Sequence, residues 1–572
     1  MSPLCAPPSR RDVFLAAGAA LTGCRTAGRH PGRLTYLLRG EPYTLDPAKS
    51  PGGSEGWILP ALFEPLLQQH PETTEPIAGL VTHYQVDGSG TRYTFYLRGH
   101  RAPQGVRLAG SDSLSAEFNH GRHGAPFEQP ARWSDGTLVT ADDIVFSWRR
   151  YLAPETAFPW AYFLFHVERA QTINKGDAPP EMLGIRAIDT YSFEVTLRAP
   201  AVDFLKLCTL PFTAPMPHHA IESARRRGRE SSWTEPGQMI SSGPFVLKES
   251  RLPEYVLISR NPRYFDAALV GVEEIHFSPA DGVMVLNLFQ TGQADSMDGR
   301  LLPLQLAPHF RGRSGFHVLP GCASHNWRIS ANRPPLDNVL LRYALNMATD
   351  KDATARFLGS GQMPAKTRVP PIEGYRSPAT LPVEINGRPL DVLGYDPRTA
   401  RELWSRVSPT SLPKLTINFP AMQDSLLRAE ILQQQWRANL GLETVLRPWD
   451  NQGFVQSVIA NCDFIGVGED SYVANYADPF DLLSLYLSGY ACWSDPEYDE
   501  MLSSATSIAH PALRMTALSA CEERLLRGMP FIPLYFDSWV YLERPEVHGL
   551  RLNFLGTPYF KYVWIDENRR IQ

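Results

Sequence analysis

The first half of this chain is divided into short apolar runs separated by polar turns. Such runs predict strands at 34–38, 93–98, 193–197 and 255–259, and the run at 93–98 alternates as a half-buried strand does. Apolar residues from Trp57 to Leu67 follow a helical spacing instead. Thr140 to Asp143 has the spacing of a capping box, so we predict a helix from there to about Leu152. The stretch 99–130 is rich in Gly, Pro, Ser and His, and is predicted to be a long surface loop or insertion.

Helical spacing dominates after residue 337. Asp337 and Asp350 are predicted helix caps, the first for a helix at 338–348, and Asp396-Pro397 opens a third helix. A helix at 426–439 ends before Gly441, and two more begin near Pro496 and Pro511. Strands are predicted at 442–447, 462–467, 531–536 and 539–543. Strands that alternate with helices predict an α/β lobe.

Chain length and composition indicate a folded protein with more than one lobe. At 572 residues and 64.0 kDa the chain exceeds the size that one core supports, about 250–300 residues. Hydrophobic residues make up 43% and charged residues 20%, which matches ordinary globular proteins. The net charge of -5 lacks the basic excess that binding to a phosphate backbone needs, so we expect no nucleic-acid partner.

The N-terminal residues have the features of an export signal. Arg10-Arg11 precedes an apolar stretch at 13–23, which is too short to span a bilayer but suits a signal peptide. Leu21-Thr22-Gly23-Cys24 resembles the lipobox of bacterial lipoproteins, in which the cysteine is lipidated. The paired arginines resemble a twin-arginine signal, although Phe14-Leu15 comes one residue late, so the general and the twin-arginine export routes both stay open. A buried helix start is the alternative, and the polar residues at 25–32 disfavour it.

Other motifs give little support to catalysis or metal binding. The run from Gly52 to Gly56 matches G-x-S-x-G, but Pro51 and the turn before it remove the strand that a serine esterase requires. No H-E-x-x-H, Walker or dinucleotide motif is present. Neighbouring His218 and His219 would point to opposite faces of a strand without an acidic partner, which favours surface histidines. The cysteines outside the leader contain no C-x-x-C pair, and one disulfide of undetermined pairing is possible.

Several short motifs follow one another in a fixed order along the chain. They are Leu45-Asp46-Pro47-Ala48 with Leu62-Phe63-Glu64-Pro65-Leu66, Trp133-Ser134-Asp135-Gly136-Thr137 with Thr140-Ala141-Asp142-Asp143, Ser242-Gly243-Pro244-Phe245, Asn261-Pro262-Arg263-Tyr264, Gly292-Gln293-Ala294-Asp295, and Pro335-Leu336-Asp337-Asn338-Val339 with Arg342-Tyr343-Ala344-Leu345. This series resembles the extracytoplasmic solute-binding proteins of peptide ABC transporters, the oligopeptide and dipeptide receptor family. The resemblance covers nearly the whole mature chain.

The resemblance implies an α/β, two-lobed periplasmic-binding-protein-like fold of type II, cluster C, with an extra subdomain inserted in the first lobe. Crossovers between the lobes are expected near residues 320 and 530, and closure about them would enclose a solute. The implied segments are 1–24 for the signal peptide, 25–33 for a tether, 34–70, 209–320 and 531–572 for lobe I, 71–208 for its inserted subdomain, and 321–530 for lobe II.

A motif of the form A-D-Y-x-[DE]-P carries the expected ligand contact. In peptide-binding members its first carboxylate pairs with the α-ammonium of the peptide, and here Ala474-Asn475-Tyr476-Ala477-Asp478-Pro479 places Asn475 at that position. An asparagine cannot neutralise a buried ammonium. Either Glu469, Asp470 or Asp478 takes that role, or the ligand lacks a free amino terminus, and for Asp478 a helix cap is the preferred reading.

Further ligand contacts are expected from backbone groups and aromatic side chains. Backbone contacts are predicted at Gly53, Ser241, Ser242 and the segment His325, Asn326 and Trp327, with ordinary loop and strand packing as the alternative. Side-chain pockets are expected from Trp160, Phe163, Trp327 and Tyr472, although aromatic residues more often belong to a core. Tyr476 of the motif is also a predicted ligand contact.

The predicted function is that of the substrate-binding component of a peptide importer. It needs no cofactor and performs no catalysis. Its partners would be an oligopeptide, ABC permease subunits and, through a lipid at Cys24, the membrane, with the protein itself a monomer. A receptor of the same fold for an opine, a sugar, a metal complex or an N-modified peptide is the alternative that Asn475 favours, and a serine esterase is a remote one.

Overall fold

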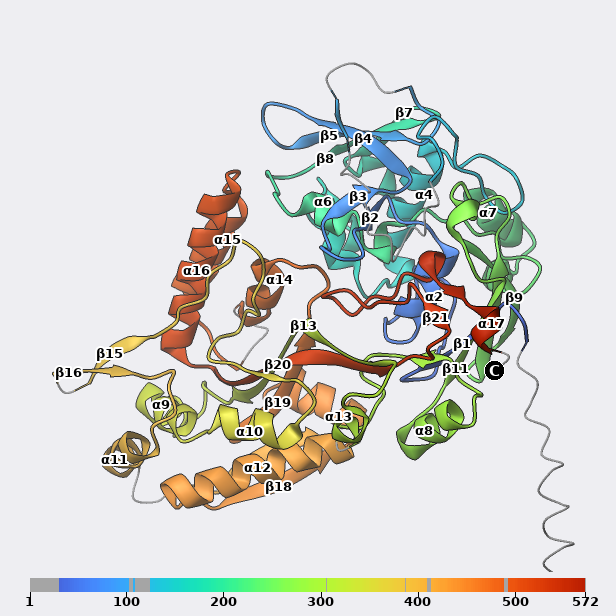
Figure 1. The fold of residues 1–572 in the computed structure, drawn as a ribbon. Helices are drawn as coiled ribbons and strands as arrows, with labels where there is room; N and C mark the ends of the chain where they lie inside the picture. Colours follow the sequence, from blue (N-terminus) through green and yellow to red (C-terminus); the bar gives the residue numbers. More distant parts are fainter. Residues whose placement is uncertain are drawn as a thin grey trace, which may run out of the picture.

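Two lobes, each with its own hydrophobic core, make up the part of the chain that the computed structural model describes (Figure 1). The described residues are 30–101, 106–108, 124–304, 306–385, 387–408, 413–487 and 492–570. The predicted signal peptide, Cys24 and much of the predicted loop at 99–130 lie outside them. None of the described helices is long and apolar enough to cross a membrane.

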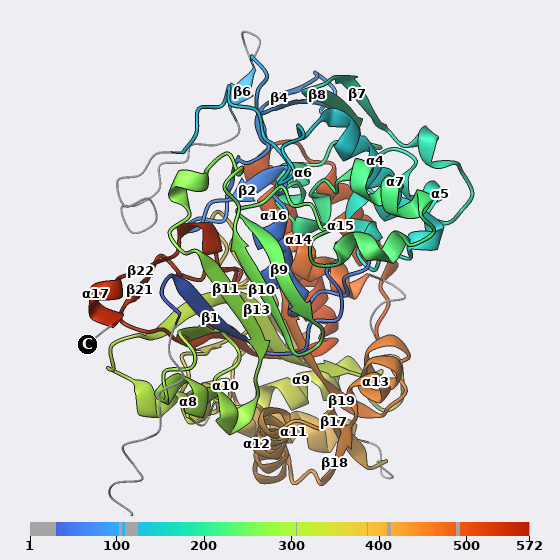
Figure 2. The same ribbon diagram turned by 90° about the vertical axis from the view of Figure 1, so that its right-hand side faces the viewer.

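The first lobe contains two five-stranded sheets that share one core (Figure 2). The first sheet has the order β12-β1-β11-β10-β9, and β1 pairs in parallel with both of its neighbours. These strands are β1 (Arg33–Leu38), β9 (Phe245–Arg251), β10 (Tyr255–Arg260), β11 (Glu274–Pro279) and β12 (Ser296–Met297). Alternate residues Leu34, Tyr36 and Leu38 of β1 are buried in the common core, as the apolar run predicts.

The second sheet of the first lobe is antiparallel, with the order β6-β4-β5-β8-β7. Its strands are β4 (Val81–Val86), β5 (Arg92–Leu97), β6 (Arg107–Leu108), β7 (Ile185–Asp189) and β8 (Ser192–Thr196). Helix α4 (Ala141–Leu152) begins where predicted, and the backbone N–H of Thr140 donates to Asp143 Oδ2 at 2.8 Å. This contact is part of a capping box at the start of α4, and Trp148 and Tyr151 of the same helix lie in the core.

The second lobe is built on a six-stranded mixed sheet of order β14-β20-β13-β19-β17-β18. Its strands are β13 (Phe316–Ile329), β14 (Met363–Pro364), β17 (Leu415–Pro420), β18 (Thr444–Trp449), β19 (Gly466–Val473) and β20 (Phe531–Leu542). The helices that contribute to the same core are α9 (Val339–Met347), α10 (Lys351–Leu358), α11 (Pro397–Val407), α12 (Gln423–Leu440), α14 (Pro479–Leu483), α15 (Pro496–Thr506) and α16 (Pro511–Gly528). Trp327 and Trp436 are fully buried there.

Two long antiparallel strands, β13 and β20, run between the lobes (Figure 1). Their pairing is irregular between Pro320 and Ser324. Beyond this point, Trp539 to Leu542 pack with Leu37 and Met297 of the first sheet in a separate cluster. The same pair of strands therefore belongs to the second lobe at one end and contacts the first lobe at the other.

The remaining α-helices and strands of the described chain are short. The helices are α2 (Glu55–Leu62), α5 (Ala170–Asn174), α6 (Phe204–Leu207), α7 (His218–Arg226), α8 (Gly282–Gln290), α13 (Asn451–Phe454) and α17 (Glu567–Arg570). Three two-stranded sheets pair β2 (Leu67–Gln69) with β3 (Pro76–Ala78), β15 (Pro382–Ile385) with β16 (Arg388–Asp391), and β21 (Val547–His548) with β22 (Trp564–Ile565).

Several predicted boundaries are wrong, each for a local reason. Helix α2 stops at Leu62, because the chain becomes extended at Phe63 ahead of Pro65. Asn338, and not Asp337, caps α9 by accepting from the Leu340 N–H. The strand predicted at 462–467 begins only at Gly466, and the strand predicted at 442–447 runs from Thr444 to Trp449.

The two strands predicted at 531–536 and 539–543 form one continuous strand, β20. By contrast, the predicted caps Asp350 and Asp396 are confirmed. The glycine that ends α12 and the starts of α15 and α16 are confirmed as well.

Gly466 provides a test of how the second sheet is held together. It has φ +138, and a Cβ at this position would collide with the backbone of Thr416 on the neighbouring strand β17. Gly466→Ala is therefore expected to lower the free energy of unfolding by more than about 1 kcal/mol, measured by urea denaturation. Gly88→Ala is the matched control, because a Cβ at Gly88 meets no atom within 4 Å. An equal loss in both variants would contradict this account of the sheet.

Candidate functional site

Two cavities lie between the lobes. We call the first the glycine cavity; it has a volume of about 260 Å³ and is bounded in part by Gly53, Trp57 and Trp160 of the first lobe and by Val473 to Asn475 of the second. We call the second the aromatic cavity; it has a volume of about 660 Å³. The first lobe supplies it with Tyr162, Phe163, Phe165, His166, Arg198, Ala199, Pro200 and Leu207. The second lobe supplies it with Tyr472, Tyr476, Phe480, Asp481, Ser484, Leu485, Leu487, Leu502, Ser503, Thr506 and Ser507. Volumes of this order hold small organic ligands.

Three side chains of the second lobe form a hydrogen-bonded cluster at the border of both cavities. Asn475 lines the glycine cavity, while Tyr472 and Asp481 line the aromatic cavity. Asn475 Nδ2 donates to the Tyr472 hydroxyl at 2.6 Å, and that hydroxyl lies 3.2 and 3.3 Å from the two Asp481 oxygens. The backbone N–H of Asn475 donates to Asp481 Oδ2 at 2.7 Å. We call these three residues the Tyr472–Asn475–Asp481 cluster.

Asp481 has an unusual charge environment. It is only 5% exposed and accepts hydrogen bonds from neutral donors, and it makes no ion pair with any cation in the described part of the chain. Burial raises the pKa of Asp481 to about 7; the hydrogen bonds from Asn475 and Tyr472 act against this rise, and the charge of Asp478 adds to it. Near neutral pH this carboxyl group is therefore divided between its protonated and ionised forms.

The carboxylates of Glu469 and Asp470 are already neutralised by arginines. Glu469 accepts from Arg428 Nε at 2.7 Å and contacts His325 Nε2 at 2.8 Å. Burial alone would raise its pKa, but the charges of Arg428 and His325 lower it to about 2. Asp470 lies 3.1 Å from Arg368 Nη1. Burial again raises the pKa, but the charges of Arg368 and then Arg328 outweigh it and lower the pKa of Asp470.

Asp478 belongs to a contact between the lobes. Its carboxylate caps α14 by accepting from the Phe480 N–H and also accepts two hydrogen bonds from Arg514, at 2.7 and 3.0 Å. Arg514 lies 3.8 Å from Asp203 of the first lobe, and the Tyr476 hydroxyl donates to Asp203 at 3.0 Å. All four side chains are at most 3% exposed. They join the lobes beside the aromatic cavity.

The other predicted contact residues are spread over different environments. Gly53 lines the glycine cavity, while Phe163 lines the aromatic cavity and stacks on Trp160. The buried Ser242 hydroxyl accepts from the Glu64 N–H. His325 stacks on Tyr535, Asn326 is fully buried and contacts Ser324, and Trp327 is fully buried in the core of the second lobe. Ser242, His325, Asn326 and Trp327 line neither cavity.

The G-x-S-x-G segment has a local structural role. The Ser54 hydroxyl donates to the Gly40 carbonyl at 2.5 Å and accepts from the Gly40 N–H at 3.2 Å. The segment leads into α2 from a turn, without the preceding strand of a nucleophile elbow. Ser54 thus anchors the start of α2.

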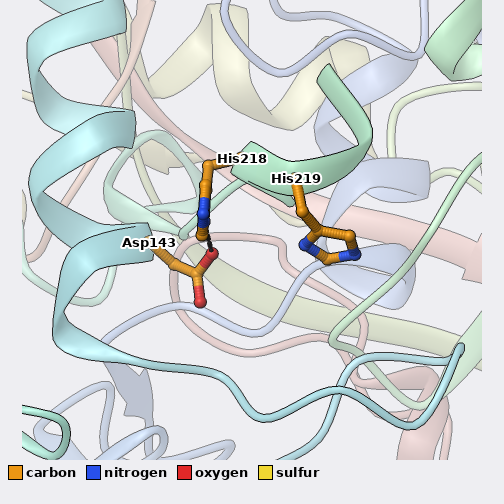
Figure 3. Close-up of side chains that lie close together, drawn as sticks. All are labelled: Asp143, His218 and His219. Atoms are coloured by element: carbon orange, nitrogen blue, oxygen red, sulfur yellow. Dashed lines mark hydrogen bonds and ion pairs between the residues drawn. The ribbon is translucent and has the colours of Figure 1, made fainter. Parts of the chain in front are cut away.

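A His–His–Asp group in the first lobe brings the buried Asp143 of α4 close to the half-buried His218 and His219 of α7 (Figure 3). The prediction that His218 and His219 lie on a strand without acidic partners is wrong: both begin helix α7. His218 Nδ1 lies 2.5 Å from Asp143, and His219 Nε2 lies 2.9 Å from Asp135. The hydrogen bond to Asp143 raises the pKa of His218. The group has donors that could hold a metal, but Asp143 already accepts from Thr140 and Trp133.

Several residues of the cleft are absent from the predictions made from sequence. Asp481 lies only three residues beyond Asp478, on the short helix that follows the recognised motif. Its position on that helix was visible in the sequence, although its burial was not. The first-lobe residues Tyr162, His166 and Arg198 had no motif, and only folding brings them opposite Tyr472.

Comparison with known families places this fold among solute-binding proteins. A family model described as "Bacterial extracellular solute-binding proteins, family 5 Middle" matches residues 129–492. The chain is 26% identical over 554 residues to the periplasmic oligopeptide-binding protein OppA of Escherichia coli, covering 94% of this chain and 93% of that one. It is 26% identical over 539 residues to the periplasmic murein peptide-binding protein MppA of the same organism, covering 91% and 90%.

Solved structures show the same two-lobed fold. The periplasmic oligopeptide-binding protein OppAIV from Borrelia burgdorferi superposes with a TM-score of 0.75 at 24% identity, covering 93% of this chain and 99% of that one. Haemophilus influenzae OppA in complex with the peptide RPPGFSPFR has a TM-score of 0.74 at 22% identity, covering 94% and 99%. The two-lobed α/β fold expected from the motifs is thereby confirmed.

Proposed function

Because this chain belongs to family 5 of the bacterial extracellular solute-binding proteins, we propose that it captures an oligopeptide between its lobes and delivers it to an ABC importer. The observation that carries this proposal is that both lobes contribute walls to both cavities. A solute held there contacts both lobes at once, so it stabilises the closed arrangement over the open one. The names of relatives such as oligopeptide-binding OppA and murein peptide-binding MppA point to peptides as the solute class.

The proposed mechanism is one of binding and closure without chemistry. The strands β13 and β20, with their irregular pairing near residue 320, serve as the connections about which the lobes move. The contact of Asp203 with Tyr476 and Arg514 forms when the lobes approach. Membrane permease subunits then recognise the closed form. In this mechanism none of the described cleft residues acts as a nucleophile, and the ligand leaves unchanged.

The proposed location is the outer face of the cytoplasmic membrane or the periplasm. The predicted leader would direct export, and lipid on Cys24 would anchor the monomeric protein. The disulfide between Cys462 and Cys492 supports an oxidising compartment, where such bonds persist.

A receptor for a different solute is the second candidate. Asn475 stands where the peptide-binding motif carries a carboxylate, and one relative at 26% identity is named a probable deoxycholate-binding periplasmic protein. The aromatic cavity, walled by Phe163 and Tyr472 among others, would also suit a largely apolar ligand.

Thermal unfolding with defined ligands tests the proposed function. A ligand at 100 times its Kd is expected to stabilise the protein by about 2.7 kcal/mol, since binding adds RT ln(1 + [L]/Kd). We expect a pool of tri- to pentapeptides to raise the melting temperature, and native mass spectrometry to show intact peptide bound to the protein. Stabilisation by deoxycholate with none by peptides would instead favour the second candidate. Release of cleaved peptide would contradict a purely binding role.

A further inference from the structure

The carboxylates in and near the two cavities differ in whether a cation already neutralises them. Arginines pair with Glu469, Asp470 and Asp478. Among the described residues, Glu64 and Asp481 are the carboxylates that line the two cavities. The positive charge of Lys561 acts on Glu64, whereas no cation is among the main influences on Asp481. Asp481 is thus the carboxylate that lines the aromatic cavity, and it forms no ion pair with any described cation.

The neighbours of Asp481 suit a primary ammonium group. Asn475 uses its Nδ2 to donate to Tyr472 and Asp481, and no described residue donates to its Oδ1. The Asn475 Oδ1 and the Asp481 carboxylate, which belong to one hydrogen-bonded cluster, can therefore accept hydrogen bonds from a ligand. An ammonium has three N–H donors and no acceptor, so it matches such a set. A buried ammonium needs a charged partner as well, and Asp481 provides one.

We propose that the Tyr472–Asn475–Asp481 cluster binds the primary ammonium group of the ligand, with Asp481 as its counter-ion. The proposal rests on the proposed function and names the part of the ligand that this cluster recognises. Asn475 cannot supply the negative charge that the motif position carries in peptide-binding members. In this proposal Asp481 on the following helix α14 supplies that charge instead. The α-amino group of a peptide and a lysine side chain share this chemistry, and the experiment separates them.

Binding should be linked to the release of a proton. In the empty cleft the pKa of Asp481 is about 7, so below this pH the carboxyl group must ionise before it can pair with an ammonium. Affinity is expected to fall up to about tenfold per pH unit between pH 7 and pH 5, because one proton is expelled. Other titratable or charged groups around this position are Tyr162, His166, Arg198, Lys206, Cys322, Tyr472, Tyr476 and Asp478.

His166 is the neighbour that could imitate this pH dependence. Burial lowers the pKa of His166 below the ordinary histidine value, but its protonation on acidification would also repel a cation bound in the cavity. The variant Asp481→Asn separates the two effects, since it removes only the carboxyl group. The amide has the shape of the protonated acid, and we expect the variant to fold as the wild type does at pH 6.

The experiment compares three pools of tripeptides by native mass spectrometry and calorimetry. The first has free amino termini and no lysine, the second is the same pool after N-acetylation, and the third is N-acetylated and contains lysine. Wild type is expected to prefer the first pool over the second by at least about thirtyfold, and Asp481→Asn is expected to abolish this preference. Preference for the third pool over the second would assign the ammonium to a lysine side chain.

Two further variants sharpen the comparison. Glu402→Gln makes the same carboxyl-to-amide change on α11, at a side chain that is 64% exposed, and should keep the wild-type preference. The exchange Asn475→Asp with Asp481→Asn moves the carboxylate back to the motif position and should restore much of the preference. Equal binding of all three pools by wild type, or an undiminished preference in Asp481→Asn, would overturn this inference while leaving peptide capture intact. Binding of none of the pools would overturn the proposed function and the inference with it.

Discussion

Replacing Arg514 with methionine is expected to lower the free energy of unfolding of the second lobe by about 3–5 kcal/mol. Arg514 is 1% exposed and makes two hydrogen bonds to Asp478, with Asp203 of the first lobe 3.8 Å away. Methionine would fill the space but leave two buried carboxylates without a counter-ion. Such an uncompensated charge costs more than the ion pair itself contributes. Urea denaturation followed by circular dichroism measures the loss.

Two comparisons separate charge burial from simple loss of packing. Arg398→Met removes an arginine that is 89% exposed and pairs with Glu402 on the helix surface, so its effect should be below about 1 kcal/mol. The double variant Arg514→Met with Asp478→Asn should recover part of the lost stability, because one of the unpaired charges is gone. A loss of less than about 1 kcal/mol in Arg514→Met would contradict the role given to this ion pair.

Removing the disulfide between Cys462 and Cys492 is expected to cost about 3–4 kcal/mol by the loop-entropy relation. The two cysteines are 30 residues apart, and the segment between them includes β19 and the residues Tyr472 to Leu487 of the cleft wall. Without the bond this segment has more freedom in the unfolded chain. Thermal unfolding of Cys462→Ala with Cys492→Ala, compared with the wild type, measures the effect.

Reduction provides an independent check on the same bond. Dithiothreitol should lower the melting temperature of the wild type and leave that of the double alanine variant unchanged. Cys208→Ala is the control, since Cys208 is a free, buried cysteine of the first lobe and should stay sensitive to dithiothreitol like the wild type. If reduction leaves the wild-type melting temperature unchanged, the disulfide does not stabilise the cleft wall.

Local sequence patterns were sufficient for much of the fold. Aspartates followed by helical spacing correctly located the starts of α10 and α11, because capping depends on residues next to one another in the chain. The motif around Tyr476 likewise led to the wall of the cleft, since a short ordered series of residues identifies the family. The predicted helix boundaries near Leu62 and Asn338 were less accurate, because each depends on the backbone conformation of the neighbouring residues.

Local sequence patterns did not predict the charge state of the residues in and near the cleft. Glu469, Asp470 and Asp478 were candidate partners of a ligand ammonium in the sequence, with a helix cap preferred for Asp478, but arginines from separate segments neutralise all three. The hydrogen bond between His218 and Asp143 likewise joins residues that are 75 positions apart in the sequence. Asp481 stands out only once its burial is known and the described residues are seen to place no cation in an ion pair with it. Such properties arise from tertiary packing, which apolar spacing does not report.

Hydrogen exchange in the presence and absence of a peptide pool tests the central claim most directly, namely that a ligand is held between the two lobes. The account predicts that peptide slows exchange both in Tyr162 to His166 of the first lobe and in Tyr472 to Leu487 of the second, while α12, which lines neither cavity, is unchanged. Protection confined to one lobe, or no protection by any peptide of the pool, would contradict it.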